Sequence, residues 1–276
     1  MAAPITNIVP VDEFDYDISK REDVKLLMSP TDLKFLIHMI KKKRPKKILE
    51  IGVCNGGSSY YLLKESGPKT IVHSVDIEKE CPLDKSRLCG YTVEDNLDKS
   101  AWENRWIRHL GMDVIDCIDE IGGDIDFVLL DTVHTMPGEF LSYLAIIPYL
   151  KKNAVVVLHD VYDNYHEIIG GKMLTTWFAD SFCTGLLLSS VPSKRKYMPN
   201  DEIPNIGAFV QSGKSIDYVY DVLRSLFVKW RYIPDDMMKK YSSMIREKYG
   251  DRAGTYFDKC LEMQYEIRDG KYLDFA

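Results

Sequence analysis

The stretch that decides the fold is ILEIGVCNGGSSYYLL, residues 48–63. An apolar segment leads into a turn with three glycines, and a second apolar segment follows the turn. A helix is predicted before this stretch, from a cap at Ser29 to the break at Pro45, and the segment TIVHSVDIE, residues 70–78, predicts a further strand. The sequence therefore predicts a strand, a glycine-rich turn, a helix and a second strand, which is the βαβ unit of a parallel sheet.

The rest of the chain extends this unit into a doubly wound α/β fold. Residues 125–131 (IDFVLLD) and 154–160 (AVVVLHD) predict buried parallel strands, with a helix over residues 140–150 between them. Two apolar segments, residues 184–191 and 206–211, predict an antiparallel hairpin at one edge of the mostly parallel sheet. Helical patterns follow over residues 215–230, 234–249 and 252–268.

The predicted organisation is one large domain with appendages. Residues 1–28 form an N-terminal extension, and residues 29–213 form the α/β domain. Residues 214–276 form a C-terminal helical extension, which we expect to pack on the sheet or to make a homo-oligomer contact. Residues 78–109 are a charged insertion, longer than a plain connection requires, and this excess predicts a lid over a binding site.

Composition and charge limit the class of protein. The chain has 36 basic and 42 acidic residues and a net charge of -6, which disfavours general nucleic-acid binding. The one dense basic run, residues 41–47, is predicted to be the solvated end of a helix. No apolar run approaches the roughly 20 residues that span a bilayer, and the N-terminus does not have the pattern of a signal peptide, so we expect no membrane segment. Six scattered cysteines without a CxxC pair predict reduced thiols and a cytoplasmic protein.

The pattern of the glycine turn indicates its ligand. A dinucleotide-binding turn needs a second glycine where Cys54 stands, and this absence argues against NAD. The chain instead has E-x-G-x-x-x-G-G-x-S from Glu50 to Ser59, and Asp76 closes the next predicted strand. This pattern resembles the cofactor turn of class I S-adenosylmethionine-dependent methyltransferases, in the form found in a small-molecule and sugar O-methyltransferase group.

The resemblance implies a cofactor site along the turn. The methionine carboxylate of S-adenosylmethionine would lie on backbone N–H groups at the start of a helix, and the ribose hydroxyls would donate to Asp76. Met112 would pack on the adenine and Asp113 would accept from its amino group. The cofactor-binding residues implied in this way are Glu50, Gly52, Gly56, Ser58, Ser59, Asp76, Met112, Asp113 and Asp131.

The resemblance extends over residues 28–209 and is closest in pattern to the catechol and caffeoyl-type O-methyltransferases. Two departures concern the catalytic region. Thr132 and Val133 replace a Gly-Asp pair of the family pattern, and Val161 stands where the catechol-type enzymes have a metal-ligating asparagine.

Methyl transfer requires that the acceptor oxygen be aligned with the methyl group and lose its proton. His134 is the predicted base, and Asp131 is a second predicted catalytic residue. Asp131, His159 and Asp160 are the predicted ligands of a divalent cation, Mg²⁺ or Ca²⁺. Structural alternatives remain open: the aspartates as caps at strand ends, the histidines as locally bonded residues, and residues 111–113 as a plain turn.

The acceptor is predicted to be a small molecule or a saccharide. Residues 162–166, which include Tyr165 and His166, combine aromatic and polar groups that could bind a sugar or a phenol or could cover the sheet edge. The alternatives for the whole chain are an NAD-linked oxidoreductase and a protein of the same fold that acts as a hydroxylase or as a noncatalytic binding protein.

Overall fold

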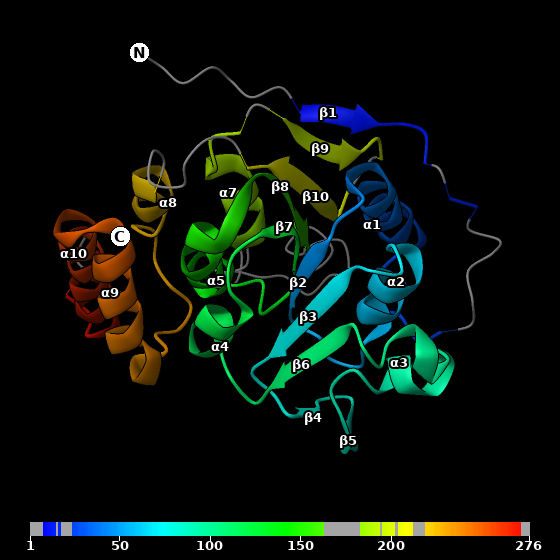
Figure 1. Cartoon of the computed structure of the whole chain (residues 1–276). Helices are drawn as coiled ribbons and strands as arrows, with labels where there is room; N and C mark the ends of the chain where they lie inside the picture. Colours follow the sequence, from blue (N-terminus) through cyan, green and yellow to red (C-terminus); the bar gives the residue numbers. More distant parts are fainter. Residues whose placement is uncertain are drawn as a thin grey trace.

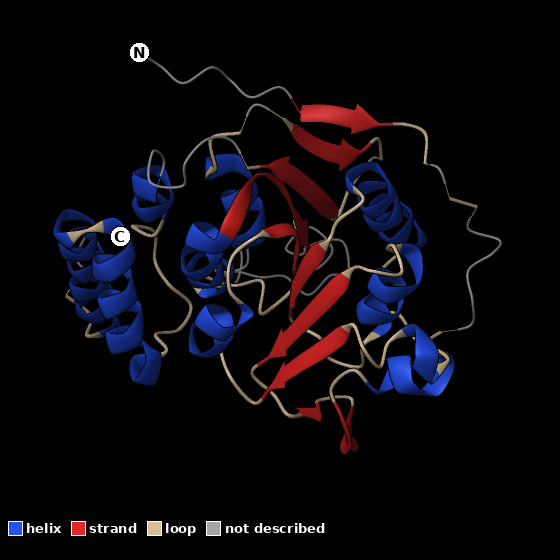
Figure 2. Cartoon of the chain, in the orientation of Figure 1, coloured by secondary structure: helices blue, strands red, loops and turns tan. Residues whose placement is uncertain are grey.

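The structure is a computed structural model that describes residues 8–14, 16–17, 24–162, 183–193, 195–201, 204–211 and 219–271. Within these residues, one large sheet lies between two layers of helices (Figures 1 and 2). One face is covered by α1 (Pro30–Lys43), α2 (Gly57–Glu65) and α3 (Tyr91–Asn96). The other face is covered by α4 (Val114–Ile121), α5 (Gly138–Ile146) and α7 (Cys183–Ser190).

The sheet has the order β1-β9-β10-β8-β7-β2-β3-β6. Its strands, in chain order, are β1 (Ile8–Val11), β2 (Lys47–Ile51), β3 (Ile71–Asp76), β6 (Trp106–Leu110), β7 (Ile125–Leu130), β8 (Leu150–His159), β9 (Lys196–Pro199) and β10 (Ile206–Val210). The central strands from β6 to β8 run parallel, whereas β10 is antiparallel to both of its neighbours, β8 and β9. The predicted doubly wound, mostly parallel sheet is confirmed. Because the strand order reverses between β2 and β7, a crevice opens at their carboxyl ends.

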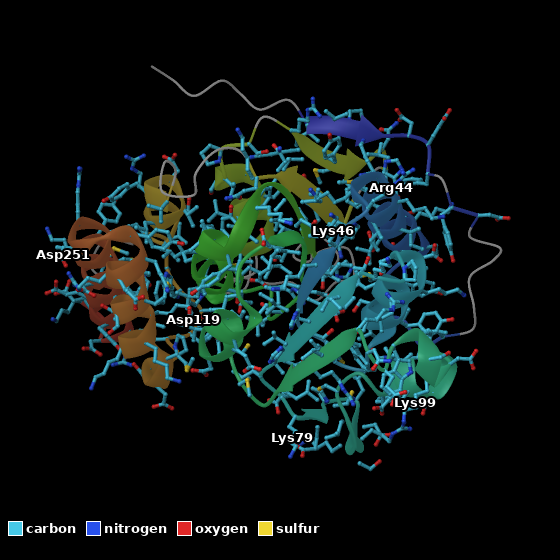
Figure 3. The ribbon with its side chains drawn as sticks, in the orientation of Figure 1. Arg44, Lys46, Lys79, Lys99, Asp119 and Asp251 are labelled. Carbon is cyan, nitrogen blue, oxygen red and sulfur yellow. The ribbon has the colours of Figure 1, made fainter. Side chains whose placement is uncertain are left out.

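Helix α1 begins with a capping box. The Ser29 hydroxyl accepts a hydrogen bond from the Asp32 backbone N–H at 3.1 Å, and the Asp32 carboxylate accepts from the Ser29 N–H at 3.2 Å. The helix ends at Arg44, whose backbone is left-handed, with φ +50°. The basic run therefore closes α1 as predicted, and Arg44 and Lys46 lie where the helix passes into β2 (Figure 3).

The prediction of a strand at residues 184–191 is wrong, because this segment is helix α7. A continuous apolar run is compatible with a buried strand or with a buried helix, and periodicity alone does not distinguish them. In the fold the run is buried against α5, α8 (Val219–Ser225) and the sheet. The edge strand that pairs with β10 is instead β9, which lies between the two segments predicted as strands. The antiparallel edge pair exists, but with a different partner.

The predicted insertion, residues 78–109, includes a strand of the main sheet. It begins with a small hairpin of β4 (Glu80–Cys81) and β5 (Asp84–Leu88), continues through α3 and the short helix η2 (Lys99–Ala101), and ends in β6. Lys79 and Lys99 project from this region into solvent (Figure 3). The sequence of β6, WIRHL, contains two charged or polar side chains and has no apolar run. The sequence therefore did not predict that this segment is a strand paired with β3.

The C-terminal helices α8, α9 (Asp235–Tyr249) and α10 (Asp251–Arg268) form an outer layer beside α4 and α5 (Figure 1). Their apolar residues share one core cluster with those of α4 and α5. The Tyr249 hydroxyl donates to the Leu144 carbonyl at 2.6 Å, and Lys248 bonds to Asp119 at 3.5 Å. Asp119 on α4 and Asp251 at the start of α10 are marked in Figure 3. None of the helices in the described ranges is long and apolar enough to cross a membrane.

Candidate functional site: a cavity at the carboxyl ends of the central strands

A cavity of about 520 Å³ lies at the carboxyl ends of β2, β3, β7 and β8. Its wall is formed by the glycine turn, the residues after β3, β7 and β8, the segment 26–28 and part of the C-terminal extension. Of the predicted cofactor residues, six line this cavity: Gly52, Ser58, Asp76, Met112, Asp113 and Asp131. Three others, Glu50, Gly56 and Ser59, lie beneath or beside the turn.

Two glycines of the turn, both with a positive φ, have different roles. At Gly52 the backbone has φ +91°, and an added Cβ would lie 1.8 Å from the Asp131 carbonyl oxygen, so only glycine fits. At Gly56 the φ is +88°, and an added Cβ would lie 2.5 Å from the Cα of Gly90. Gly52 thus lets β2 approach the end of β7, whereas Gly56 lets the turn pack against the segment before α3.

Asp76 holds the glycine turn from the end of β3. Its Oδ2 accepts hydrogen bonds from the backbone N–H groups of Val53 at 2.8 Å and Cys54 at 2.9 Å. Its Oδ1 accepts from the Glu78 N–H at 2.9 Å. A carboxylate oxygen has two acceptor positions, so Oδ1 keeps one of them for a hydroxyl in the cavity.

Glu50 is fully buried behind the turn and does not line the cavity. Its carboxyl accepts hydrogen bonds from the hydroxyls of Ser58, Ser59 and Ser74, each at 2.6 Å. Desolvation raises the pKa of Glu50 to about 7, although the three hydroxyl bonds lower it. Gly56 is the N-cap of α2, so the hydroxyls of Ser58 and Ser59 do not cap the helix but bond Glu50.

Met112 and Asp113 lie at the end of the cavity formed after β6. Met112 is 37% exposed and is part of the cavity wall. Asp113 is the N-cap of α4, where its Oδ1 accepts from the Ile115 N–H at 3.0 Å. The same oxygen accepts from the Tyr241 hydroxyl at 2.7 Å. Asp113 is therefore both a helix cap and a residue of the cavity.

A group of acidic and histidine side chains lies at the other end of the cavity. His134 Nε2 is 3.1 Å from Asp160 Oδ2 and 3.8 Å from Asp131 Oδ1. His159 Nδ1 is 3.2 Å from Asp131 Oδ1 and 3.4 Å from Asp160 Oδ2. On its other side, His159 Nε2 is 3.6 Å from an oxygen of Asp32 on α1. The four predicted residues of the catalytic and metal sites are thus in mutual contact.

The charges in this group explain two pKa shifts. Burial would lower the pKa of His159, but three surrounding carboxylates, with Asp131 the strongest, raise it well above its usual value. Burial would raise the pKa of Asp160, but His159 and further partners keep it below its usual value. His159 is therefore an imidazolium that partly neutralises the two aspartates.

Two residues of the site were missed in the sequence. Glu139 is fully buried at the start of α5, and its Oε1 accepts from the His134 backbone N–H at 2.8 Å and from the Thr132 hydroxyl at 2.7 Å. Asn205, just before β10, donates its side-chain amide to Asp160 Oδ1. Glu139 was missed because an acidic residue in the first turn of a helix is ordinarily explained by the helix dipole. Asn205 was missed because it reaches Asp160 only through the pairing of β10 with β8.

These side chains can also hold a metal ion. Ligand atoms of Asp131, His134 and Asp160 all lie within 4.8 Å of one another, which is the single such group in the described ranges. Two carboxylates and an imidazole suit Mg²⁺ and related hard divalent cations. This group contains His134 in place of the predicted ligand His159. Asp163, Tyr165 and His166, named as acceptor-binding candidates, lie outside the described residues.

The chain resembles known proteins in sequence and in fold. Residues 49–161 match the family model described as a methyltransferase domain. Among solved structures, the O-methyltransferase TomG of Streptomyces achromogenes, involved in tomaymycin synthesis and crystallised with S-adenosylmethionine, is 18% identical with a TM-score of 0.50 over 68% of this chain and 82% of its own.

A protein of Staphylococcus aureus assigned as a caffeoyl-CoA O-methyltransferase is 18% identical, with a TM-score of 0.52 over 69% of this chain and 87% of its own. No curated protein matches the sequence. At this identity the two structures establish the fold, and the family model establishes the domain. Residues 49–161 therefore match a methyltransferase domain, and the chain shares the fold of the two O-methyltransferase structures.

Proposed function

We propose that the protein binds S-adenosylmethionine in the cavity and transfers the methyl group to a hydroxyl of a small molecule, with a phenol or a saccharide as the acceptor. One observation carries this proposal: the group of Asp131, His134 and Asp160 lines the same cavity as the glycine turn and Asp76. The proposed cofactor site and the side chains that can accept a proton therefore border one continuous cavity.

The cofactor is assigned along the cavity from Asp76 to the start of α2. The ribose hydroxyls donate to Asp76, which remains able to accept at Oδ1. The methionine carboxylate takes the backbone N–H groups near Ser58, where the positive end of the helix dipole favours an anion. The sulfonium methyl then points toward the end of the cavity that contains His134.

His134 is assigned as the base. Attack of the acceptor oxygen on the methyl carbon would break the C–S bond and turn the sulfonium into a neutral thioether, and the hydroxyl proton would pass to the imidazole of His134, whose Nε2 faces Asp160. Asp160, 3.1 Å from that nitrogen, stabilises the resulting imidazolium. Glu139 accepts from the His134 N–H and helps to hold the left-handed backbone of His134, which has φ +58°.

A divalent cation fits the same end of the cavity. Asp131 and Asp160 would hold Mg²⁺ or Ca²⁺, with His134 as a third ligand or as the free base. A cation bound there would orient the acceptor hydroxyl and lower its pKa. We assign His159 to charge neutralisation and orientation of the two aspartates.

Two measurements test the proposal. Calorimetric titration with S-adenosylhomocysteine should show binding at one site, whereas NADH should not bind. Incubation with methyl-labelled S-adenosylmethionine and a panel of phenols, catechols and saccharides should label a member of the panel. Binding of the cofactor without labelling of any hydroxyl compound, in the presence or absence of Mg²⁺, would favour the noncatalytic alternative. Failure to bind S-adenosylhomocysteine would refute the cofactor assignment itself.

A further inference from the structure

We propose that the C-terminal extension completes the cofactor site, and that Tyr241 on α9 is a positioning residue that holds Asp113 for recognition of the adenine amino group. This inference rests on the proposed function, because it concerns the same cofactor. It gives the extension a role in binding that the sequence did not predict.

Residues of the extension form part of the cavity wall. Four residues, from the segment before α9 and from α9 itself, line the cavity together with Met112 and Asp113: Tyr232, Pro234, Met237 and Tyr241. This wall is firmly anchored. The Arg231 N–H donates to the Met136 carbonyl at 3.0 Å, and the Tyr249 hydroxyl at the end of α9 donates to α5.

The contact between Tyr241 and Asp113 fixes the direction of the carboxylate. Tyr241 is 1% exposed, and its hydroxyl donates to Asp113 Oδ1 at 2.7 Å. Burial and the charge of Asp113 raise the pKa of Tyr241 well above its usual value, so the hydroxyl keeps its proton and donates. With the Ile115 N–H, the two acceptor positions of Oδ1 are filled.

The second oxygen of Asp113 is left for a ligand. Within the described part of the chain, no hydrogen bond to Oδ2 is formed. A carboxylate oxygen on the wall of a cavity suits a ligand that donates an N–H, and Met112 beside it offers an apolar surface to a flat ring. An adenine presents both features, an exocyclic amino group and an aromatic face.

Tyr232 adds to the same wall from the side of β7 and α5. Its hydroxyl would lie 3.3 Å from a Cβ added at Gly138, so the ring lies over the start of α5. Burial, followed by the charge of Glu139, raises the pKa of Tyr232 above its usual value. The ring is neutral and remains 38% exposed, as expected for a side chain that borders a cavity still to be filled.

The test compares two ligands, S-adenosylhomocysteine and S-inosylhomocysteine, which has a carbonyl oxygen in place of the amino group. The wild-type protein should prefer the adenosyl compound. Tyr241→Phe should weaken binding of the adenosyl compound about tenfold and leave that of the inosyl compound nearly unchanged, so that discrimination falls. Asp113→Asn, whose amide can donate to the carbonyl, should reverse the preference.

The matched control is Tyr265→Phe. Tyr265 lies on α10 and donates to Asp235 at 2.9 Å, so this substitution removes a similar tyrosine–aspartate hydrogen bond away from the cavity. It should leave both affinities unchanged. Melting temperatures establish that the variants are folded. Should Tyr241→Phe fail to fold, Tyr232→Ala tests the other half of the proposal, the contribution of the C-terminal extension to the cavity wall. Tyr232 is partly exposed, and its replacement should weaken binding of both compounds several-fold; unchanged affinities would refute that contribution.

Distinct results overturn the two proposals. If the wild-type protein binds neither compound, the cofactor assignment fails and this inference fails with it. If the wild-type protein binds and discriminates, but folded Tyr241→Phe keeps the same affinity and the same preference, the role of Tyr241 is refuted and the proposed function stands. A general loss of affinity for both compounds in Tyr241→Phe would indicate a structural role and would also refute the positioning of Asp113.

Discussion

At the scale of single residues, Glu50 belongs to a sequence pattern that predicts the cofactor turn, but its side chain supports the turn from below and does not line the cavity. The E-x-G pattern implied that Glu50 binds the cofactor. In the structure the carboxyl is buried under the turn and is held by three serine hydroxyls. The sequence cannot distinguish these roles, because a side chain at the end of a strand points to one face or the other according to the twist and register of the sheet.

The raised pKa of Glu50 predicts a pH-dependent stability. In the folded protein the Glu50 carboxyl holds its proton up to about pH 7, whereas in the unfolded chain it releases the proton near its ordinary pKa of 4.5. The folded state therefore binds more protons in this window, and stability falls as the pH rises from about 4.5 to about 7, by about 3 kcal/mol. Glu50→Gln should remove this part of the slope. Urea unfolding at several pH values measures it, and an unchanged slope in the variant would contradict the assignment.

Asp76 gives the second prediction at this scale. Asp76→Ala should weaken S-adenosylhomocysteine binding by ~1 to 3 kcal/mol, because it removes the proposed ribose acceptor and two hydrogen bonds that shape the turn. The control is Asp126→Ala. Asp126 is buried at the opposite end of the sheet and accepts from the Lys46 and Lys47 N–H groups. Both variants should lose stability, but only the first should lose affinity in a calorimetric titration.

At the scale of elements, the strands that form the floor of the cavity were predictable and the edges were not. β7 and β8 are covered on both faces, so their sequences are apolar runs that identify a parallel strand. β6 contains Arg108 and His109 and was predicted as part of an insertion, while α7 has the apolar run of a strand. Edge strands and short buried helices take their structure from tertiary contacts, which local patterns do not contain.

The hairpin of β4 and β5 gives a prediction about the insertion. The sequence predicted a lid over the acceptor. In the structure Glu78 and Pro82 of this region border the cavity, together with Ile77 just before it, and Glu78 bonds Asp76. Cys81 packs with its sulfur 4.0 Å from that of Cys54 in the glycine turn. We therefore expect that replacing residues 82–87 with a short turn weakens cofactor binding.

The measurement is a comparison of the dissociation constant of S-adenosylhomocysteine with the kcat of methyl transfer at saturating cofactor. An increase in the dissociation constant with an unchanged kcat would place the hairpin at the cofactor end. The reverse result, a lower kcat with unchanged cofactor binding, would support the original expectation of a lid over the acceptor.

At the scale of the whole molecule, the fold concentrates charge at one rim. Asp32 comes from α1, Asp131 and His134 follow β7, and His159 and Asp160 end β8. The sequence predicted that most of these residues meet, because the carboxyl ends of parallel strands lie at one edge. It could not predict Asp32 or Asn205, which reach the group through the packing of α1 and the pairing of β10.

The last prediction concerns the charge balance of this rim. Asp131 and Asp160 face each other across His134 and His159, and two nearby carboxylates disfavour each other's charged form unless a cation lies between them. His159 supplies one positive charge, which leaves a net negative site for a divalent cation and an acceptor hydroxyl. Treatment with a chelator should therefore lower methyl transfer strongly, and added Mg²⁺ should restore it.

Two substitutions separate the metal from the base. Asp160→Asn keeps the shape of the side chain but removes a charged ligand, so it should lower turnover and raise the Mg²⁺ concentration required, with the affinity for S-adenosylhomocysteine nearly intact. His134→Ala should slow methyl transfer by ~10² to 10⁴ at saturating Mg²⁺ if the imidazole takes the proton. Full activity in chelator together with a large effect of His134→Ala would mean that His159 alone neutralises the two aspartates, and that the imidazole of His134 performs the proton transfer without a metal ion.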